Sequence, residues 1–320
     1  MKKFVCQFGV RVIIVIVIAI AVDYVISAGL RKTDIRKYST WNDIYKGGLD
    51  ADLLVIGASN AWSGFNTYIM DSALHLNSYN LGFDGHNIDY YIVRYNTYRR
   101  FNAKPKVVLI NTLFSGTLDV SAHPQYEREQ FFPFVNDKEL MSQVAEAKNL
   151  GWKERYLPLV RYFGYREEIE NGVLAFFGKK DFLDGGMHKG FRGNDYAWDE
   201  ETLSKDTLIS ISINTEAVLQ LNSFSKQLID DGIQVFFVKS PIYYPLRSKF
   251  ENIEQTDSVF NAIANKYDIT ILDYYFSRIS MDSAYFYNPG HLNIRGSEEF
   301  TLELCHDLDS IWNHLRLLAQ

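Results

Sequence analysis

The chain has 320 residues, of which 47% are hydrophobic, so it can bury a full core without disulfides or a structural metal. Its formal net charge of -6 argues against a general nucleic-acid surface, because phosphate binding requires a basic face. The two cysteines, Cys6 and Cys305, lie near opposite ends of the chain, and no disulfide is expected between them.

An apolar segment near the N-terminus, residues 10–30, is long enough to cross a bilayer, since about 20 apolar residues suffice. We expect residues 1–31 to form a single-pass signal anchor, with the following domain outside the cytoplasm. Two alternatives stay open, namely a signal peptide cleaved near Ala19-Ile20-Ala21 and a buried core helix. Asp23 lies in the outer third of the segment, where a carboxylate reaches the interface at lower cost. Basic residues flank both ends, so charge alone does not set the orientation.

Residues 32–50 are polar and predict a spacer, after which strands and helices alternate. Strands are expected at 51–56, 78–83 and 106–113, and helices at 67–75 and 88–101. An insert at about 115–213 interrupts the alternation and contains one predicted helix at 138–149. Helices are then expected at 216–231, 251–267 and 294–315, and strands at 233–240 and 269–274. This alternation predicts an α/β domain with a parallel sheet over residues 51–320.

Aromatic residues are frequent, at 15% of the chain, and several lie near predicted loops. Each of these side chains is expected in the core, with a sugar-binding face as the alternative: Trp62, Tyr126, Phe131, Phe132, Tyr196 and Trp198. An insert of this kind commonly forms the wall of a binding site.

Ser59 is a candidate nucleophile, because Gly57-Ala58-Ser59-Asn60 directly follows the first buried strand. This position leaves its hydroxyl at the carboxyl edge of a parallel sheet, where open α/β sheets bind ligands. The alternative is an ordinary turn serine, since this tetrapeptide is good loop chemistry anywhere.

His291 is the candidate base for Ser59, and it stands in Asn288-Pro289-Gly290-His291, on a loop between the last predicted strand and the last helix. A serine is a weak nucleophile unless a base removes its proton, so the pair matters more than either residue. Parallel strands would bring both residues to the same sheet edge. The alternative is a surface loop histidine without a role.

These two motifs resemble the nucleophile and histidine motifs of the SGNH/GDSL-like hydrolases. The resemblance implies a three-layer α/β sandwich with a central parallel sheet, as in flavodoxin. It also implies an oxyanion hole formed by the N–H groups of Ser59 and Gly82, with Gly85 as an alternative to Gly82, and by Asn111. The order of the motifs argues against an α/β-hydrolase, whose serine stands in Gly-x-Ser-x-Gly and usually follows several strands.

The sequence departs from that family in two places. The family's Gly-x-Asn-Asp motif is missing, and residues 107–114 offer only Asn111, about three positions early. Asn288 occupies the position of the acid that orients the histidine, and an amide cannot stabilise an imidazolium as a carboxylate does. A Ser-His dyad, a contribution from Asp282 or another carboxylate, or an inactive binding protein would each fit.

We expect neither a metal nor a cofactor. The seven histidines include no His-x-x-x-His pair, and Gly57-Ala58-Ser59 lacks the lysine of a phosphate-binding loop. The expected function is a serine esterase or O-acyltransferase acting on acyl groups of envelope or secreted polysaccharide. Expected partners are acylated carbohydrate, the membrane through the N-terminal helix, and polysaccharide-assembly proteins, but not nucleic acid. The alternatives are a membrane-tethered glycan-binding protein and a lipid or thioester hydrolase.

Overall fold

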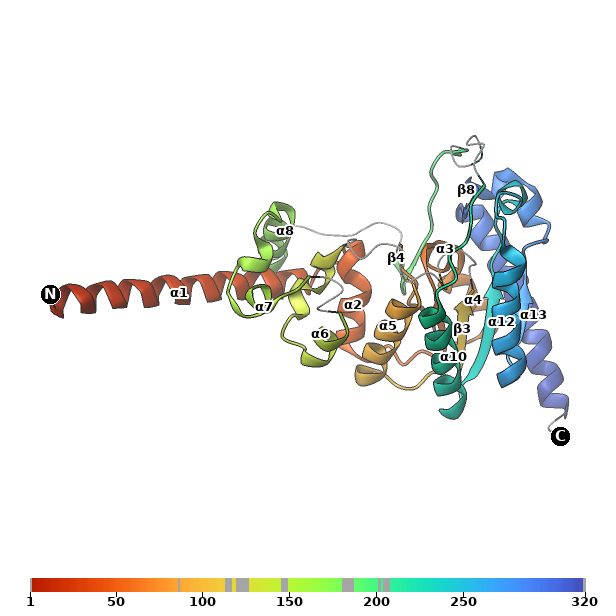
Figure 1. Ribbon diagram of the computed structural model, residues 1–320, viewed down its shortest axis with the longest axis horizontal. Coiled ribbons are helices and arrows are strands. Elements are labelled where there is room, and N and C mark those ends of the chain that lie inside the picture. Colours follow the sequence, from red (N-terminus) through yellow and green to blue (C-terminus); the bar gives the residue numbers. More distant parts are fainter. Residues whose placement is uncertain are drawn as a thin grey trace. The chain divides into compact units, whose positions relative to one another are not determined.

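The computed structural model describes residues 2–85, 87–112, 117–118, 127–144, 149–179, 187–200, 203 and 208–318 (Figure 1). The chain divides into two compact units. Unit 1 comprises Met1–Lys46 and Pro124–Gly185, and unit 2 comprises Gly47–His123 and Gly186–Gln320.

Unit 2 is built on a five-stranded sheet in which every strand is parallel to its neighbours. Its strands are β1 (Leu53–Ile56), β2 (Ser78–Asn80), β3 (Val107–Asn111), β6 (Gln234–Lys239) and β7 (Thr270–Asp273), in the spatial order β2-β1-β3-β6-β7. Counted along the sheet strands alone, this is the order 2-1-3-4-5 of flavodoxin-like folds. The prediction of an α/β fold with a central parallel sheet is confirmed.

Helices cover both faces of this sheet. Side chains alternate between the two faces of each strand, and the residues of β1 and β3 are buried on both. Leu53, Val55 and Phe236 share one buried cluster with Phe65 and Phe300, beneath the helices α3 (Ser59–Gly64), α4 (Thr67–Leu74) and α13 (Ile294–Leu318). On the opposite face, Phe237 packs against Phe260, with ring centroids 6.3 Å apart. That face carries α5 (Ile88–Phe101), α10 (Thr215–Asp230) and α12 (Ile253–Tyr267).

Shorter elements complete unit 2. They are the hairpin β4 (Met187–His188) and β5 (Phe191–Arg192), the helix α11 (Tyr244–Arg247), the 3-10 turns η3 (Ile279–Met281) and η4 (Ser283–Tyr285), and the hairpin β8 (Phe286–Asn288) and β9 (His291–Leu292). The prediction that His291 lies on a loop was therefore wrong. It opens β9 and pairs across the hairpin with Asn288.

Helix boundaries in unit 2 follow local capping chemistry. The Asn66 side chain accepts hydrogen bonds from the N–H groups of Tyr68 and Ile69 at the start of α4. Asn214 does the same for Glu216 and Ala217 at the start of α10. Gly232 follows α10 with φ +72, a left-handed conformation that glycine adopts without strain. The predicted stop of this helix at Gly232 is confirmed.

Unit 1 is helical within its described residues. It contains α1 (Lys2–Leu30), α2 (Arg36–Lys46), η1 (Arg128–Phe134), α6 (Lys138–Val144), α7 (Trp152–Tyr156), η2 (Val160–Tyr162) and α8 (Arg166–Phe176). The stretch 32–50, expected to be a polar spacer, holds α2, whose Trp41 is fully buried and donates to Gln130 Oε1 at 2.8 Å. The helix predicted at 138–149 ends at Val144, and residues 145–148 lie outside the described part of the chain.

Helix α1 is long and apolar enough to cross a membrane. Its most apolar window has no buried residue, so the alternative of a buried core helix is wrong for this segment. Only the C-terminal end of α1, at Ile26, Ser27, Gly29 and Leu30, is buried within the protein.

Candidate active site

Ser59 is the first residue of α3 and follows the strand β1 after only two residues. All four residues of β1 are buried, which fixes the strand within the sheet. Gly57 makes the tight connection to α3 sterically allowed, because a Cβ there would lie 2.5 Å from Ala61 Cβ and 2.9 Å from Asn111 Cβ. The half-buried Ser59 hydroxyl therefore stands at the carboxyl edge of β1.

The structure brings together Ser59, His291 and Asn288, which are the three residues expected to be catalytic. Ser59 Oγ lies 2.7 Å from His291 Nε2. On the other side of the ring, His291 Nδ1 lies 2.8 Å from Asn288 Oδ1. Both distances are normal for hydrogen bonds, so the three side chains form a continuous chain.

The hydrogen bonds around Asn288 define the proton on the histidine ring. Asn288 Oδ1 also accepts the Gly290 N–H at 3.0 Å, which orients the amide oxygen toward this site. The facing ring atom, Nδ1, must therefore carry a proton and donate it to Asn288. In the neutral ring Nε2 is then the acceptor, and the Ser59 hydroxyl donates to it. This is the tautomer that a general base needs.

Two asparagines that sequence reasoning missed hold the pieces of the site in place. Asn60 Nδ2 donates to the Gly290 carbonyl and so joins α3 to the β8–β9 hairpin. Asn80, at the end of β2, donates to the carbonyls of Ala61 at 2.8 Å and Phe65 at 3.1 Å. The Ala61 carbonyl also accepts the Phe65 N–H, and Phe65 follows the last residue of α3, so Asn80 holds the C-terminal end of this six-residue helix. The position of Asn60 beside Ser59 was the one available sequence signal.

Burial lowers the pKa of His291 below its ordinary value, because the charged form loses solvation, and the negative charge of Asp84 partly opposes this. The ring of Tyr287 stacks on His291 with centroids 5.5 Å apart. Burial raises the pKa of Tyr287 to about 12, so its ring is neutral near pH 7. The imidazole is therefore held in its neutral, basic form.

Asp282, one carboxylate considered for orienting the histidine, has a different local role. Its side chain accepts the Ala284 N–H at 2.9 Å and caps the turn η4. Asp84 is the carboxylate that acts electrostatically on His291.

Gly82 and Asn111, the two further residues expected in the oxyanion hole, form hydrogen bonds with other groups of the protein. The Gly82 N–H donates to Asn80 Oδ1 at 2.8 Å. Asn111 is fully buried, and in the amide orientation that satisfies its neighbours it accepts the Ala61 N–H at 3.1 Å and donates to the Val238 carbonyl at 2.9 Å. Asn111 thus positions α3, and the oxyanion roles of Gly82 and Asn111 stay predictions.

The six candidate aromatic residues separate into core and surface. Trp62, Phe131 and Phe132 are buried, so a sugar-binding role for them is not supported, and Tyr126 lies outside the described residues. Tyr196 is 62% exposed and meets Tyr287 edge-on at 5.5 Å. Trp198 is 36% exposed and meets Tyr243 edge-on at 5.4 Å. Tyr196 therefore contacts the tyrosine that stacks on His291, and an aromatic surface extends outward from the site.

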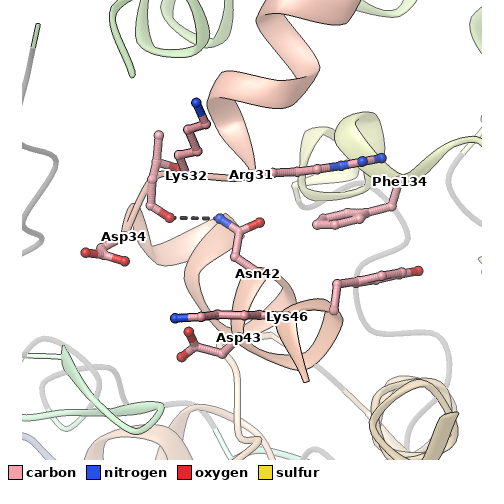
Figure 2. Close-up of a pocket in the computed structure, with 9 residues that line it drawn as sticks. Arg31, Lys32, Asp34, Asn42, Asp43, Lys46 and Phe134 are labelled. Carbon is pink, nitrogen blue, oxygen red and sulfur yellow. Dashed lines mark hydrogen bonds between the residues drawn. The ribbon is translucent and has the colours of Figure 1, made fainter. Parts of the chain in front are cut away.

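Within the described residues, no group of three or more His, Cys, Asp or Glu side chains is arranged to hold a metal ion. A separate cavity of about 540 Å³ lies in unit 1 (Figure 2), and Ser59 is not among its lining residues. Its wall mixes charges of both signs from Arg31, Lys32, Asp34, Asp43 and Lys46, and Arg31 lies over the Phe134 ring at 5.4 Å. The lining residues of this cavity include no serine, cysteine or histidine.

No protein-family model matches the chain, and no curated protein matches it in sequence. Among solved structures, it is similar to a Bacteroides fragilis NCTC 9343 protein described as a "putative acylhydrolase". The two share 13% sequence identity with a TM-score of 0.36, over 80% of this chain and 86% of the other. Similarity at this level does not establish a shared function.

Proposed function

We propose that this chain is a membrane-anchored serine esterase or O-acyltransferase. Its substrates are ester-linked acyl groups, acetyl groups in particular, on cell-envelope or secreted polysaccharide. The single observation that supports the proposal is the hydrogen-bonded chain from Ser59 through His291 to Asn288, with 2.7 Å between Ser59 Oγ and His291 Nε2. A nucleophile, a base within hydrogen-bond reach and a group that orients the base are the minimum for acyl transfer through a serine.

In the first half-reaction, Ser59 Oγ attacks the carbonyl carbon of the ester while His291 Nε2 takes the hydroxyl proton. The Ser59 N–H belongs to the first turn of α3, has no intrahelical acceptor and is the proposed first donor to the oxyanion. Gly82 would be a second donor once its N–H leaves Asn80. The tetrahedral intermediate then collapses, the sugar oxygen leaves with the proton from His291, and an acyl-serine remains.

In the second half-reaction, His291 takes the proton of an incoming hydroxyl, whose oxygen attacks the carbonyl carbon of the acyl-serine. The bond between the acyl group and Ser59 Oγ then breaks, and Ser59 Oγ takes the proton back from His291. Water as this acceptor gives hydrolysis, and a sugar hydroxyl gives transfer. The imidazolium formed in each half-reaction faces an amide oxygen, so Asn288 orients the ring without offering a full negative charge. We expect a slower enzyme than one with a carboxylate at this position.

The aromatic surface supports the proposed substrate, and the apolar helix supports the proposed location. Exposed aromatic faces such as those of Tyr196 and Trp198 suit sugar rings. Tyr196 contacts Tyr287, the residue that stacks on His291. Helix α1 would anchor the chain with unit 2 outside the cytoplasm, where envelope polysaccharide and the proteins that assemble it are found.

Mutating Tyr196 and Trp198 to Ala together should raise KM for acetylated xylan and leave p-nitrophenyl acetate hydrolysis unchanged. Longer acyl esters in the same panel test the lipid or thioester alternative.

A second function is favoured by the same departures from a hydrolase site. Asn288 replaces the acid, and the Gly82 N–H and the Asn111 amide are both engaged inside the protein. A membrane-tethered glycan-binding or assembly protein with an inactive site would have these features.

A fluorophosphonate probe distinguishes the two functions on the full chain in detergent. The esterase proposal expects covalent labelling that Ser59→Ala abolishes and that Ser142→Ala, at an exposed serine on α6, leaves intact. Hydrolysis of p-nitrophenyl acetate should fall by about 10³-fold or more in Ser59→Ala. A folded wild-type protein that resists the probe would favour the binding protein.

A further inference from the structure

The C-terminal end of α1 is fixed to the rest of unit 1 by direct contact between helix backbones. A Cβ on Gly29 would lie 1.7 Å from the Gly172 carbonyl oxygen, and one on Gly172 would lie 2.6 Å from the Ile26 carbonyl oxygen. Glycine at both positions is what allows α1 and α8 to approach so closely. Ser27 Oγ also bonds Tyr162 Oη of η2 at 2.8 Å.

Polar contacts hold the same end of α1 at Asp23. Its carboxylate accepts the Leu159 N–H at 2.8 Å and forms an ion pair with Arg161, whose side chain is 5% exposed. The helix therefore leaves the packed part of unit 1 at the level of Asp23 and Tyr24. Beyond this level large apolar side chains are exposed along α1 from Phe4 to Val22, interrupted by the exposed polar side chains of Gln7 and Arg11. At 1.5 Å per residue this stretch is about 30 Å long, the thickness of a bilayer core.

Large exposed side chains lie near that level of unit 1, on α7, on the turn after it and at the end of α8. Phe177 follows Phe176, whose ring meets Tyr24 at 6.5 Å. Leu157 lies two residues before Leu159, which bonds Asp23. We call the following set the collar: Trp152 (61% exposed), Tyr156 (68%), Leu157 (41%) and Phe177 (62%). Figure 1 shows α7 and α8 beside the C-terminal part of α1, while its N-terminal part projects free.

Basic side chains accompany the collar. Lys153 Nζ lies over the Trp152 ring at 5.9 Å, and the Arg155 guanidinium lies over the Tyr156 ring at 5.5 Å. Aromatic rings paired with Lys and Arg are typical of protein surfaces that sit among lipid headgroups. Exposed apolar side chains of this size in one region indicate an interaction surface.

We propose that the collar lies in the headgroup region of the lipid bilayer that α1 crosses, so that unit 1 rests on the membrane surface. The lipid is the occupant because the collar adjoins the level at which the bare apolar part of α1 begins. This inference rests on the proposed membrane anchor. The Asp23–Arg161 pair would then mark the boundary between lipid and protein.

The test uses full-length protein with Cys6→Ser, reconstituted in phosphatidylcholine liposomes that contain some phosphatidylglycerol. Cys305 is buried, so a single introduced cysteine can carry an environment-sensitive fluorophore. The labelled positions are Phe177→Cys in the collar, Ile16→Cys in the bare part of α1, and Ser142→Cys on α6 as the water-exposed control. Lipids with a nitroxide at a shallow or a deep acyl position act as quenchers.

The proposal expects shallow nitroxides to quench the Phe177 label several-fold more than the Ser142 label, with a blue-shifted emission. Deep nitroxides should quench the Ile16 label most. If the Phe177 label behaves like the Ser142 label while the Ile16 label is quenched, the proposal that the collar lies among lipid headgroups is wrong. The proposal that α1 crosses the membrane would still hold. A collar that binds a protein partner would give this same outcome, because no partner is present. An unquenched Ile16 label would instead show that the anchor itself is wrong.

Discussion

The His291 imidazole stands between two neutral partners, a serine hydroxyl and an amide oxygen. Catalysis through such a ring requires a positive charge to form on a histidine whose hydrogen-bond partner is an amide oxygen and not a carboxylate. The ring nevertheless has the correct tautomer, because Asn288 Oδ1 is directed at Nδ1 by the Gly290 N–H. Orientation and charge stabilisation, which one carboxylate usually provides together, are separated at this site.

Replacing Asn288 by Asp tests that separation. Asn288 Oδ1 accepts two hydrogen bonds, one from the Gly290 N–H and one from the His291 Nδ1–H. A carboxylate oxygen at the same position could accept both. We expect kcat for p-nitrophenyl acetate to rise about tenfold, because a carboxylate stabilises the imidazolium, which the amide oxygen only orients. Asn288→Ala, which removes the acceptor, should lower kcat. Equal rates in wild type and Asn288→Asp would mean that another group already stabilises the imidazolium.

The pH dependence of the reaction should report the pKa of His291. Protonated imidazole cannot accept the Ser59 proton, so kcat/KM falls as pH decreases through this pKa. Burial lowers the pKa, which keeps the base active below its ordinary midpoint, and Asp84 partly opposes that effect.

Removing the Asp84 charge as Asp84→Asn should therefore move the acidic limb of the profile to lower pH. Asn288→Asp, which places a carboxylate against the ring, should move it to higher pH. Profiles of kcat/KM for the three proteins check both directions. A limb that does not move in Asp84→Asn would mean that solvent screens this charge.

At the scale of single elements, α3 depends on its surroundings more than on its own sequence. Its six residues, Ser59–Gly64, have no apolar helical stripe, and Asn80 and Asn111 bond its backbone from two strands. Gly57 is equally necessary, because any larger residue would separate β1 from α3.

Gly57→Ala should destabilise the protein by about 1–3 kcal/mol, the usual cost of an overpacked methyl group. Gly290→Ala is the matched control in the other half of the site, since a Cβ there meets no atom closer than 3.7 Å. Urea unfolding in detergent, followed by tryptophan fluorescence, compares the two. Similar losses of stability in both variants would contradict the steric account of Gly57.

The elements that sequence analysis predicted are those whose signals are local. Residues 88–101 form α5 as expected, and the buried hydrophobic runs at β1, β3 and β6 formed neighbouring parallel strands. The elements that it missed depend on distant contacts. The β8–β9 hairpin pairs only a few residues, and α2 is polar on average but buries Trp41 in unit 1.

The same distinction applies to the site. A shared sheet edge was enough to predict that Ser59 and His291 would be close, because the order of strands and helices implied a parallel sheet. The hydrogen bond from Asn60 to Gly290 joins residues 230 positions apart, and no pattern in the sequence indicates it. Nor did any pattern indicate that Asn80 would engage the Gly82 N–H.

At the scale of the whole chain, the candidate chemistry and the apolar helix belong to different units. Ser59, His291 and Asn288 lie in unit 2, whereas α1 and the collar lie in unit 1. A change that loosens α1 within unit 1 should therefore leave the chemical step intact. This separation allows the anchoring role to be tested without loss of the esterase readout.

Gly29→Leu should release α1 from α8, because a side chain at this position overlaps the Gly172 carbonyl. Gly9→Leu is the matched control on the same helix, where a Cβ meets nothing within 4 Å. Overpacking of this kind costs about 1–3 kcal/mol, so the population of molecules in which unit 1 is locally open should increase about 5- to 150-fold. Trypsin should then cleave at the buried Arg161 faster by the same factor. Gly9→Leu should match wild type, and both variants should retain p-nitrophenyl acetate hydrolysis. Equal cleavage of the two variants would show that the glycine contact does not hold α1, whereas a loss of hydrolysis in Gly29→Leu alone would show that the two units are coupled.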